Sequence, residues 1–520
     1  MKKLLLYPSL FLMAVLCMCA CHKPTAEVFE PAREFTPTKM SVTGGDTVVT
    51  ISWPASVNAA PGLTYTLQIS TDSSFSGKPD LSLVVNTTSV QVTDDSLMDR
   101  TPYYVRIKAN GNNGSADSYW GLDTISFSFV GVQIFKTIGS SDVIDVAAIL
   151  RWTPTPGVSE ITLTDPGGNT AQYAVTDAAG AVGIDTIYNL KPGIKYSAEI
   201  FAGTKSKGLE TFTTKTAATG ANIIDLRGIA DADVLVDTLP DIASGSTVLL
   251  ERGMTYNVQG YTIGKTVTIM SGLGFGDPAV LSLGSNFNAA GNIDSIRFSD
   301  LVIAASGTNY FFNISNLTNI NKMSVVNCTT QGQFANSFIR MQTANDRIGT
   351  LTIDNCIIDS VGVKANYAVI YANASSSAII DNIRISNSTF YYLNYFIRED
   401  GVAPASLQVS NCTFDNFISQ NGYFANYSGT PPPTFNISNC IFGNTLDPAS
   451  SNGVKSSQNA AFSNSYMTSD CVFSANPFTG VTSYAGTAAG LFTGPATGDF
   501  TIKDGSFAGK SSAGDPRWRD

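Results

Sequence analysis

A short phrase recurs seven times between residues 296 and 467 and constrains the fold of this 520-residue chain more than any other feature. In each copy, two apolar residues separated by one position precede a polar residue, then Asn or Asp, Cys or Ser, any residue and a mostly apolar one. Successive copies begin 24 to 32 residues apart. A unit that returns at this period is typical of a solenoid, in which each unit buries its apolar face against its neighbours. The copies are IRFSDLVI, MSVVNCTT, LTIDNCII, IRISNSTF, LQVSNCTF, FNISNCIF and AAFSNSYM.

Apolar and polar residues alternate within the phrase. Side chains two positions apart share one face of a strand, so this period of two indicates β-strands rather than the helices of other repeat proteins. A second apolar strand follows each of the first five phrases at a similar offset, which supports two or more parallel sheets wound around one core. The sequence therefore predicts a parallel β-helix. The second strands are NYFFN (309–313), NSFIR (336–340), NYAVIY (366–371), NYFIR (394–398) and NGYFAN (421–426).

The phrase places one Asn in each coil, and we expect these residues to stack at a corner of the β-helix. Asn tolerates a left-handed backbone, and amides stacked about 4.8 Å apart can hydrogen bond from one coil to the next. Their predicted role is structural. The ladder comprises Asn327, Asn355, Asn387, Asn411, Asn439 and Asn464, with Asp300 before them.

Cysteines follow four of these Asn residues and share the parity of the core positions. One thiol per coil, with no His or second Cys nearby in the sequence, is poorly suited to a disulfide or a metal site. We interpret them as small buried apolar residues, with disulfide or metal binding as the alternative. These cysteines are Cys328, Cys356, Cys412 and Cys440.

Residues 1–20 have the pattern of a bacterial export signal. Two lysines precede an apolar run at 4–16, which is short for a membrane span, and three cysteines follow it. Ala20 supplies the small residue that cleavage favours, so we predict lipidation at Cys21, with Cys19 or cleavage without lipid as alternatives. The mature chain would then be extracytoplasmic and tethered by lipid, in the outer membrane or on the cell surface of a Gram-negative bacterium.

Two β-rich modules lie between the anchor and the solenoid. Residues 21–36 are polar and contain Pro, as expected of a tether. Strand patterns and turn residues then predict sandwiches at 37–131 and 132–217, followed by the β-helix at 218–520. Leu190, Pro192 and Tyr196 resemble the tyrosine corner of fibronectin type III domains. We expect the sandwiches to act as spacers, with carbohydrate binding at an exposed Trp120 as the alternative.

Composition limits the classes of partner. Charged residues make up 14% of the chain, well below the usual share of about a quarter. The net charge of −10 argues against nucleic acid as a partner and against an anionic surface as a general one.

Two segments resemble known β-helix proteins. GSTVLLERGMTYNVQGYTIGKTVTIMSGLGFGDPAVL (245–281) is similar to the opening coils of right-handed, pectate-lyase-like β-helices, and PATGDFTIKDGSFAGKSSAGDPRW (495–518) to the Gly-Asp-Phe coil that closes many of them. Over residues 222–520 the chain resembles uncharacterised lipoproteins of bacterial glycan-utilisation systems. The resemblance implies a right-handed parallel β-helix behind fibronectin type III-like domains, a polysaccharide ligand and glycan-uptake machinery as a partner.

One column of polar and aromatic residues ends the second strands. Arg340 and Arg398 lie two coils apart, about 10 Å by the strand spacing, with Tyr371 between them. Arg suits bidentate carboxylate binding and Tyr can stack on a sugar ring, so we predict a site for an acidic saccharide here. The alternative is a set of solvated residues in which Arg398 pairs with a neighbouring carboxylate. The candidate ligand-binding residues are Arg340, Tyr371, Arg398, Glu399 and Asp400, in a column that also contains Asn313 and Asn426.

Three functions remain open from the sequence: polysaccharide binding without cleavage and without a cofactor, cleavage, and a structural or adhesive role. Pectate-lyase-like enzymes need acidic ligands for calcium and an Arg or Lys base, while related hydrolases need clustered Asp residues. The sequence shows no Asp cluster on one strand face, and its single His adjoins the anchor. Binding is therefore favoured, and calcium is expected only if the protein is a lyase. Residues available for cleavage are Arg340, Asp346, Arg398, Glu399 and Asp400.

Overall fold

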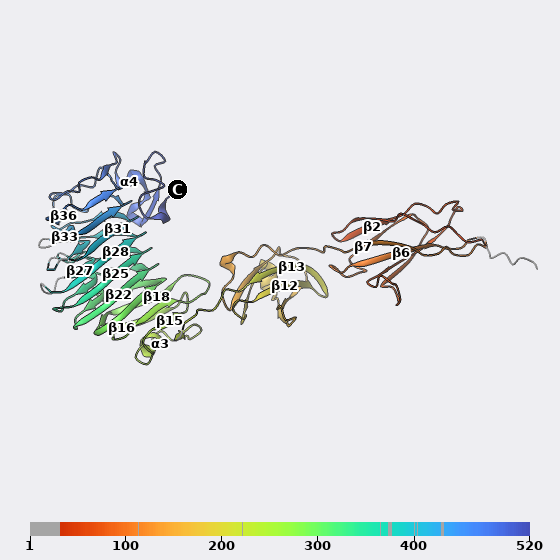
Figure 1. Cartoon of the computed structure of the whole chain (residues 1–520), viewed down its shortest axis with the longest axis horizontal. Helices are drawn as coiled ribbons and strands as arrows, with labels where there is room; N and C mark the ends of the chain where they lie inside the picture. The colour runs from red at the N-terminus through yellow and green to blue at the C-terminus, as the bar shows by residue number, and fades with distance from the viewer. Residues whose placement is uncertain are drawn as a thin grey trace, which may run out of the picture. The chain divides into compact units, whose positions relative to one another are not determined.

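The computed structural model describes residues 32–519, apart from positions 113, 221, 365, 373–376, 400, 403 and 428–430, and the side chains of 122–125. The predicted lipidation site Cys21 and the candidate residue Asp400 lie outside the described residues. The chain divides into two compact units, Met1–Lys215 and Thr216–Asp520, which are coloured red to yellow and green to blue in Figure 1. Within the described ranges, no helix is both long enough and apolar enough to cross a bilayer.

The first unit contains an antiparallel sandwich with a sheet of three strands and a sheet of four. Its alternating apolar residues enclose a core that contains Trp53, Tyr65 and Ile107. This three-plus-four arrangement is that of a fibronectin type III domain, as the sequence predicts. The three-stranded sheet is β1 (Ser41–Gly44), β2 (Val48–Ser52) and β5 (Ser89–Thr93), and the other is β4 (Leu81–Val85), β3 (Tyr65–Ser70), β6 (Tyr103–Ala109) and β7 (Gly121–Phe127).

A second antiparallel sandwich follows, with fully buried Trp152 in its core. The Tyr196 hydroxyl accepts a hydrogen bond from the Lys191 N–H at 3.0 Å, which is the tyrosine corner. The residues before Lys195 form this turn, and the next strand begins at Lys195. Its sheets are β8 (Ala147–Arg151) with β11 (Ile184–Tyr188), and β10 (Thr170–Ala174), β9 (Val158–Thr164), β12 (Lys195–Ala202) and β13 (Lys205–Thr213); the helix α2 (Asp177–Val182) precedes β11.

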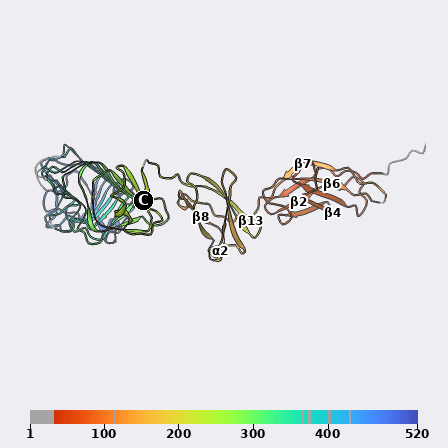
Figure 2. The ribbon, with the colours of Figure 1, turned by 90° about the horizontal axis from the view of Figure 1, so that it is seen from below.

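The second unit is a parallel β-helix, as the recurring phrase predicts. Three runs of parallel strands form its faces, and Figure 1 shows them stacked from β15 to β36. Figure 2 looks along this stack, where successive coils overlie one another. The first face is a ten-stranded sheet, and the opening residues of the seven phrases lie in its last seven strands. Its strands are β14 (Ile223–Asp225), β15 (Ser246–Leu250), β17 (Val267–Ser271), β19 (Gly291–Ser299), β22 (Thr318–Val326), β25 (Arg347–Asp354), β28 (Ile379–Ser386), β31 (Ser406–Ser410), β34 (Thr434–Ser438) and β37 (Ala461–Ser463).

The other two faces branch from one long strand, β18 (Ala279–Ala289), which also pairs with β16 (Thr255–Ile263). The second face is β20 (Leu301–Ala305), β23 (Thr329–Gln331), β26 (Ile357–Asp359), β29 (Thr389–Leu393), β32 (Thr413–Phe417), β35 (Ile441–Phe442), β38 (Tyr466–Met467) and β39 (Thr482–Ser483). The third face is β21 (Tyr310–Ile314), β24 (Ser337–Met341), β27 (Ile370–Ala372), β30 (Ile397–Arg398), β33 (Tyr423–Tyr427) and β36 (Asn452–Ser456).

The corner between the first and second faces is formed by the Asn of each phrase. All seven corner residues, from Asp300 to Asn464, have φ between 44° and 56°, the left-handed region that Asn tolerates. Amide hydrogen bonds join neighbouring coils in pairs: Asn355 to Asn327 at 2.8 Å, Asn411 to Asn387 at 3.2 Å and Asn464 to Asn439 at 2.8 Å.

Replacement of Asn439 tests how this corner is held. We expect Asn439→Ala to cost about 2 kcal/mol, because Ala disfavours a left-handed φ and loses the bond with Asn464. Asn439→Gly keeps the backbone accessible and should cost about 1 kcal/mol less. Urea denaturation of both variants measures the difference, and an Ala variant as stable as the Gly variant would show that φ does not select Asn here.

The residue after each corner Asn is a hydrogen-bond donor to the carbonyl two residues earlier. Cys356 Sγ lies 3.3 Å from Asp354 O, and Ser388 Oγ makes the equivalent bond to Ser386 O at 2.6 Å. The five described cysteines are buried and free. The residues that follow the corner Asn are therefore buried as expected. They are not merely apolar, because a thiol or a hydroxyl makes the same hydrogen bond in this turn.

Aromatic side chains fill the later coils. Phe390, Phe414 and Phe442 occupy one column, with successive rings stacked at 5.3 Å and interplanar angles of 11° and 10°. Phe478 covers the end of this stack, 4.7 Å from the Phe442 ring. At the opposite end, Leu235 of α3 (Val234–Thr238) packs into the same core. Both ends of the solenoid core are thus covered.

The C-terminal segment does not form a closing coil, contrary to the resemblance. Its strands β40 (Phe492–Gly494) and β41 (Asp499–Ile502) pair antiparallel outside the solenoid sheets, after helix α4 (Ala488–Leu491). Phe500 and its neighbours form a small second core with Ile441 of the second face. Buried Asp515 accepts a hydrogen bond from Thr389 Oγ1 at 2.8 Å, and its N–H donates to Thr413 Oγ1 at 2.9 Å. The segment therefore ties neighbouring coils together from outside.

Candidate functional site

The predicted column of polar and aromatic residues lies on the third face, one residue per strand. Strand pairing aligns Asn313 with Arg340, Arg340 with Tyr371, Tyr371 with Arg398 and Arg398 with Asn426. Lys455 on β36 continues the same column beyond Asn426. The register inferred from the sequence is therefore the register of the sheet.

Arg340 is held between two tyrosine rings. Its Nη1 donates to the Tyr310 hydroxyl at 3.0 Å, and its guanidinium carbon lies 5.5 Å from the Tyr310 ring centre and 5.7 Å from that of Tyr367. The two rings meet edge to face, 6.1 Å apart. Burial raises the pKa of Tyr310, so its hydroxyl stays neutral at physiological pH. The half-buried guanidinium is thus fixed in position by its neighbours.

Arg398 is held in a similar way two strands further along. Its guanidinium carbon lies 4.8 Å from the centre of the Tyr371 ring, and its Nη1 donates to the backbone carbonyl of Asn366 at 3.1 Å. Tyr371 is only 6% exposed, because Arg398 and Tyr367 cover it. Tyr371 therefore serves as a support for Arg398, and its ring offers little open surface for a sugar.

Further tyrosines extend this surface toward the C-terminal coils. Tyr395 and Tyr423 stand next to each other with ring centres 5.9 Å apart, and Lys455 Nζ lies 5.6 Å from the Tyr423 ring centre. Tyr395 is buried, its hydroxyl donating to the carbonyl of Asn421, while Tyr423 is half-buried and Lys455 is exposed. We call the whole set the tyrosine–arginine face: Tyr310, Arg340, Tyr367, Tyr371, Tyr395, Arg398, Tyr423 and Lys455.

Five of the eight residues of this face were not predicted from the sequence: Tyr310, Tyr367, Tyr395, Tyr423 and Lys455. Tyr310, Tyr367 and Tyr395 each follow an Asn at the start of a quoted second strand, so the signal was a recurring Asn-Tyr pair. Two consecutive residues, Phe396 just before β30 and Ile397 at its start, belong to the solenoid core, which puts Tyr395 and Arg398 outside that core together. A strict period of two would have placed them on opposite faces.

Glu399 does not belong to the tyrosine–arginine face, which corrects the expectation for this residue. Its side chain is 2% exposed and points inward, where Oε1 accepts a hydrogen bond from the Ile380 N–H at 2.7 Å. Oε2 has no hydrogen-bond partner among the described residues, and the buried Tyr427 hydroxyl nearby likewise has none. Burial raises the pKa of Glu399 to about 8, so the carboxyl is protonated at neutral pH.

Asp346, a candidate for cleavage chemistry, is also buried in the solenoid. Its two carboxylate oxygens accept hydrogen bonds from the Thr318 and Thr343 N–H groups at 3.0 and 2.9 Å, which ties adjacent coils together. Burial raises its pKa to about 6. Among the residues that the structure describes, no three His, Cys, Asp or Glu side chains gather as they would around a metal ion.

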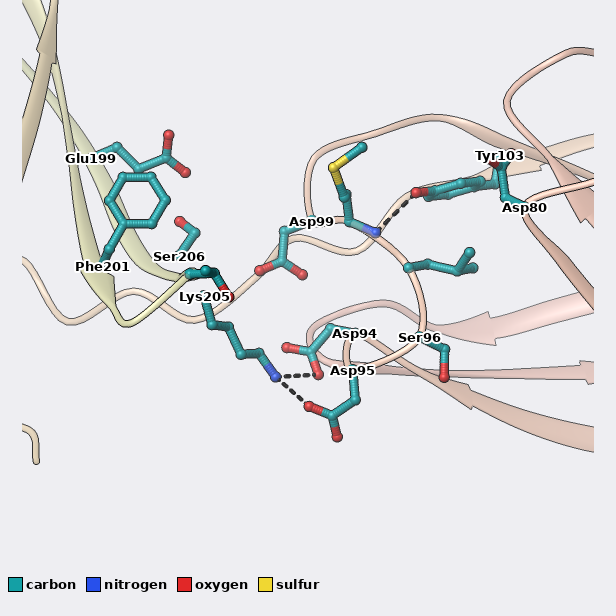
Figure 3. A pocket seen from close by; sticks show the side chains of 13 residues that line it. Asp80, Asp94, Asp95, Ser96, Asp99, Tyr103, Glu199, Phe201, Lys205 and Ser206 are labelled. Carbon is teal, nitrogen blue, oxygen red and sulfur yellow. Dashed lines mark hydrogen bonds and ion pairs between the residues drawn. The ribbon is translucent and has the colours of Figure 1, made fainter. Parts of the chain in front are cut away.

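The first unit contains an acidic pocket of about 560 Å³, shown in Figure 3. Lys205 bridges Asp94 and Asp95 at 3.0 and 2.7 Å, while Asp99 and Glu199 face the same space. Burial and the nearby Asp94 raise the pKa of Asp99. Some of the charged side chains that line this pocket are thus already paired with one another.

Trp120, the tryptophan considered for sugar binding, is half-buried. The Arg106 guanidinium lies 4.3 Å from one of its rings and 4.5 Å from the Phe75 ring, and Lys108 Nζ approaches Trp120 at 5.1 Å. The indole is thus already covered by cationic side chains of the same sheet. The tyrosine–arginine face remains the strongest candidate site.

Comparison with known proteins gives a family only for the C-terminal part. Residues 407–518 match a domain of unknown function (DUF5123). No curated protein is significantly similar to this sequence. Among solved structures, a segment of two fibronectin type III domains from chicken tenascin is 20% identical, with 35% of this chain and 99% of that chain covered and a TM-score of 0.19. The FN1–FN3 domains of chicken CNTN1 are 17% identical, with coverage of 36% and 70% and a TM-score of 0.17.

Proposed function

We propose that this protein is an extracytoplasmic lipoprotein that binds an acidic polysaccharide along the tyrosine–arginine face without cleaving it, as part of glycan utilisation. The observation that carries this proposal is the alignment of Arg340, Arg398 and Lys455 in one column of a rigid solenoid, on a chain whose net charge is −10. A cationic row on an otherwise acidic protein favours an anionic ligand at that place.

Preorganisation supports binding at this face. Guanidinium groups match carboxylates bidentately, and Arg340 and Arg398 are already oriented by tyrosine rings and by hydrogen bonds. Little side-chain entropy is then lost when a ligand binds. The half-buried rings of Tyr310, Tyr367 and Tyr423 add amphipathic surface at the edges, which suits a sugar that is apolar on one side and hydroxylated on the other.

The rest of the chain fits the same role. A lipid at Cys21 would attach the protein to the outer membrane or cell surface, and the two sandwiches would hold the β-helix away from it. A bound polysaccharide would then be kept near glycan-uptake machinery. A structural or adhesive role would need the same architecture but no ligand on the tyrosine–arginine face.

Cleavage is the competing function, and the described carboxylates disfavour it. A lyase or hydrolase needs acidic side chains that reach its substrate. Glu399 and Asp346 instead lie inside the solenoid and bind backbone N–H groups. Asp381 pairs with Arg347 on the first face at 2.6 Å.

A binding screen with the purified mature protein tests the proposal. We expect an acidic polysaccharide to be retained, and Arg340→Ala combined with Arg398→Ala to weaken its binding by about a hundredfold, since each charged hydrogen bond contributes about 1.5 kcal/mol or more. Isothermal titration calorimetry measures the change. Absorbance of unsaturated uronides and a reducing-end assay on the same mixtures should stay flat.

Arg297→Ala combined with Arg384→Ala is the matched control, because it removes two arginines from the first face. This control should bind as the wild-type protein does. Formation of cleavage products would show that the protein is an enzyme rather than a binding protein. Unchanged affinity in the Arg340/Arg398 variant would show that the ligand does not bind at the tyrosine–arginine face. Absence of binding across a broad glycan panel would favour a structural or adhesive role.

A further inference from the structure

Cationic and uncharged residues alternate along the column of the third face. From β21 to β36 the aligned positions hold Asn, Arg, Tyr, Arg, Asn and Lys. Every second strand therefore carries a cation, and successive cations are about 10 Å apart by the spacing of paired strands. Because the strands are held in register, this spacing is a fixed property of the sheet.

A polysaccharide that lies along the stack meets this column at regular intervals. One pyranose residue of an extended chain advances by close to one strand spacing, so two residues advance by close to the distance between cations. We propose that the ligand is a linear polysaccharide with one anionic group per disaccharide, whose successive anionic groups contact Arg340, Arg398 and Lys455. This inference rests on the proposed function and specifies its ligand class.

The positions between the cations disfavour a charge on every sugar. Tyr371 is 6% exposed and lies under Arg398, and Asn426 is 7% exposed, so neither offers a cation to a second carboxylate. A carboxylate held there would lose part of its hydration without gaining an ion pair. Uncharged sugars meet no such penalty, since their hydroxyl groups can remain toward solvent. The column therefore selects against a fully charged polysaccharide through its uncharged positions, as well as for periodic charge through its cations.

Local order supports a specific spacing rather than a diffuse basic patch. Each of the three cations contacts a tyrosine ring: Arg340 those of Tyr310 and Tyr367, Arg398 that of Tyr371, and Lys455 that of Tyr423. Cation–π contact restrains a long side chain that would otherwise sample many positions. A restrained set of charges at equal steps can select a polymer by its charge period.

The first experiment compares two classes of acidic polysaccharide by calorimetry with the full mature protein. Hyaluronan and unsulfated chondroitin carry one carboxylate per disaccharide, whereas polygalacturonate and alginate carry one per sugar. We expect at least one member of the first class to bind about tenfold or more tightly than both members of the second at equal chain length. Equal or tighter binding of the fully charged class would overturn the inference while leaving the proposed function intact. No binding by either class would count against both.

The second experiment uses chain length to count contacts. Three cations at this spacing match three disaccharides, so affinity for the alternating class should rise from the tetrasaccharide, which carries two anionic groups, to the hexasaccharide, which carries three, and then level off. In Lys455→Ala the rise from four to six sugars should disappear, whereas in Lys322→Ala, which changes an exposed lysine of the first face, it should persist. A length dependence that is the same in both variants would show that Lys455 does not continue the site.

Discussion

Replacement of Phe414 by Ala is expected to lower the free energy of unfolding of the β-helix by about 3–5 kcal/mol, the usual cost of removing a buried aromatic ring. Phe414 is fully buried between Phe390 and Phe442, with both rings stacked at 5.3 Å. It also meets Phe396 at 4.8 Å and Phe424 at 5.1 Å, edge to face. No neighbouring coil can close the resulting cavity without breaking the strand register, so little of the loss can be recovered.

Chemical denaturation followed by far-ultraviolet circular dichroism measures this effect. Leu317→Ala provides the control, because Leu317 is 63% exposed and lies in the same solenoid. The control should change the free energy of unfolding by less than about 0.5 kcal/mol. A Phe414 variant as stable as the control would mean that the aromatic stack does not hold the later coils together.

The second large effect concerns pH. We expect the wild-type protein to lose stability relative to Glu399→Gln as pH rises from about 4.5 to about 9, by up to about 5 kcal/mol at about 1.4 kcal/mol per pH unit. Burial raises the pKa of Glu399 from 4.5 to about 8 in the folded protein. Gln keeps the acceptor for the Ile380 N–H and the shape of the side chain, so it removes only the titration.

The sign follows from the proton balance. Below about pH 4.5 both folded and unfolded chains hold the Glu399 proton, so folding is not penalised. Above that pH the unfolded chain releases the proton while the folded chain retains it, until the pH passes about 8. The contribution of Glu399 to the free energy of unfolding is therefore fully present at acid pH and is lost as the pH rises.

Asp504→Asn serves as a control of opposite sign. Hydrogen bonds from Ser506 and Tyr484 lower the pKa of Asp504, so its contribution is lost as pH falls rather than as it rises. Because Asp504 titrates below its ordinary pKa of 3.8, the stability curves of the three proteins are measured from about pH 2 to pH 9, where they should separate in these two directions. Parallel curves for wild-type protein and Glu399→Gln would show that Glu399 is not buried in the folded state.

Much of the solenoid could be predicted because it follows from one repeated local rule. The Asn of each phrase fixes the corner, and counting from it to the next strand aligns Arg340, Tyr371 and Arg398 as the sheet does. Strand parity also held the information that Glu399 points away from Arg398, since neighbours in a strand face opposite sides. The predicted grouping of Glu399 with the arginines is inconsistent with this alternation.

Other features depend on contacts that local patterns do not encode. Two consecutive inward residues, Phe396 and Ile397, bring Tyr395 to the same surface as Arg398, which breaks the period of two. The C-terminal segment resembles a closing Gly-Asp-Phe coil in sequence, yet Asp515 and Trp518 bind Thr389 on the outside of the second face. Only the long-range packing decides between these outcomes.

Unequal coil lengths have a consequence for how such a surface can change. Asn355 to Asn387 spans 32 residues and Asn387 to Asn411 spans 24, yet both coils keep their strands in register. The longer coil uses residues 360–369 to connect β26 to β27, where the shorter one needs only 394–396 between β29 and β30. Tyr367 belongs to that extra length. New recognition residues can therefore be inserted at this edge by evolution or by grafting, while the buried core that carries them stays unaltered.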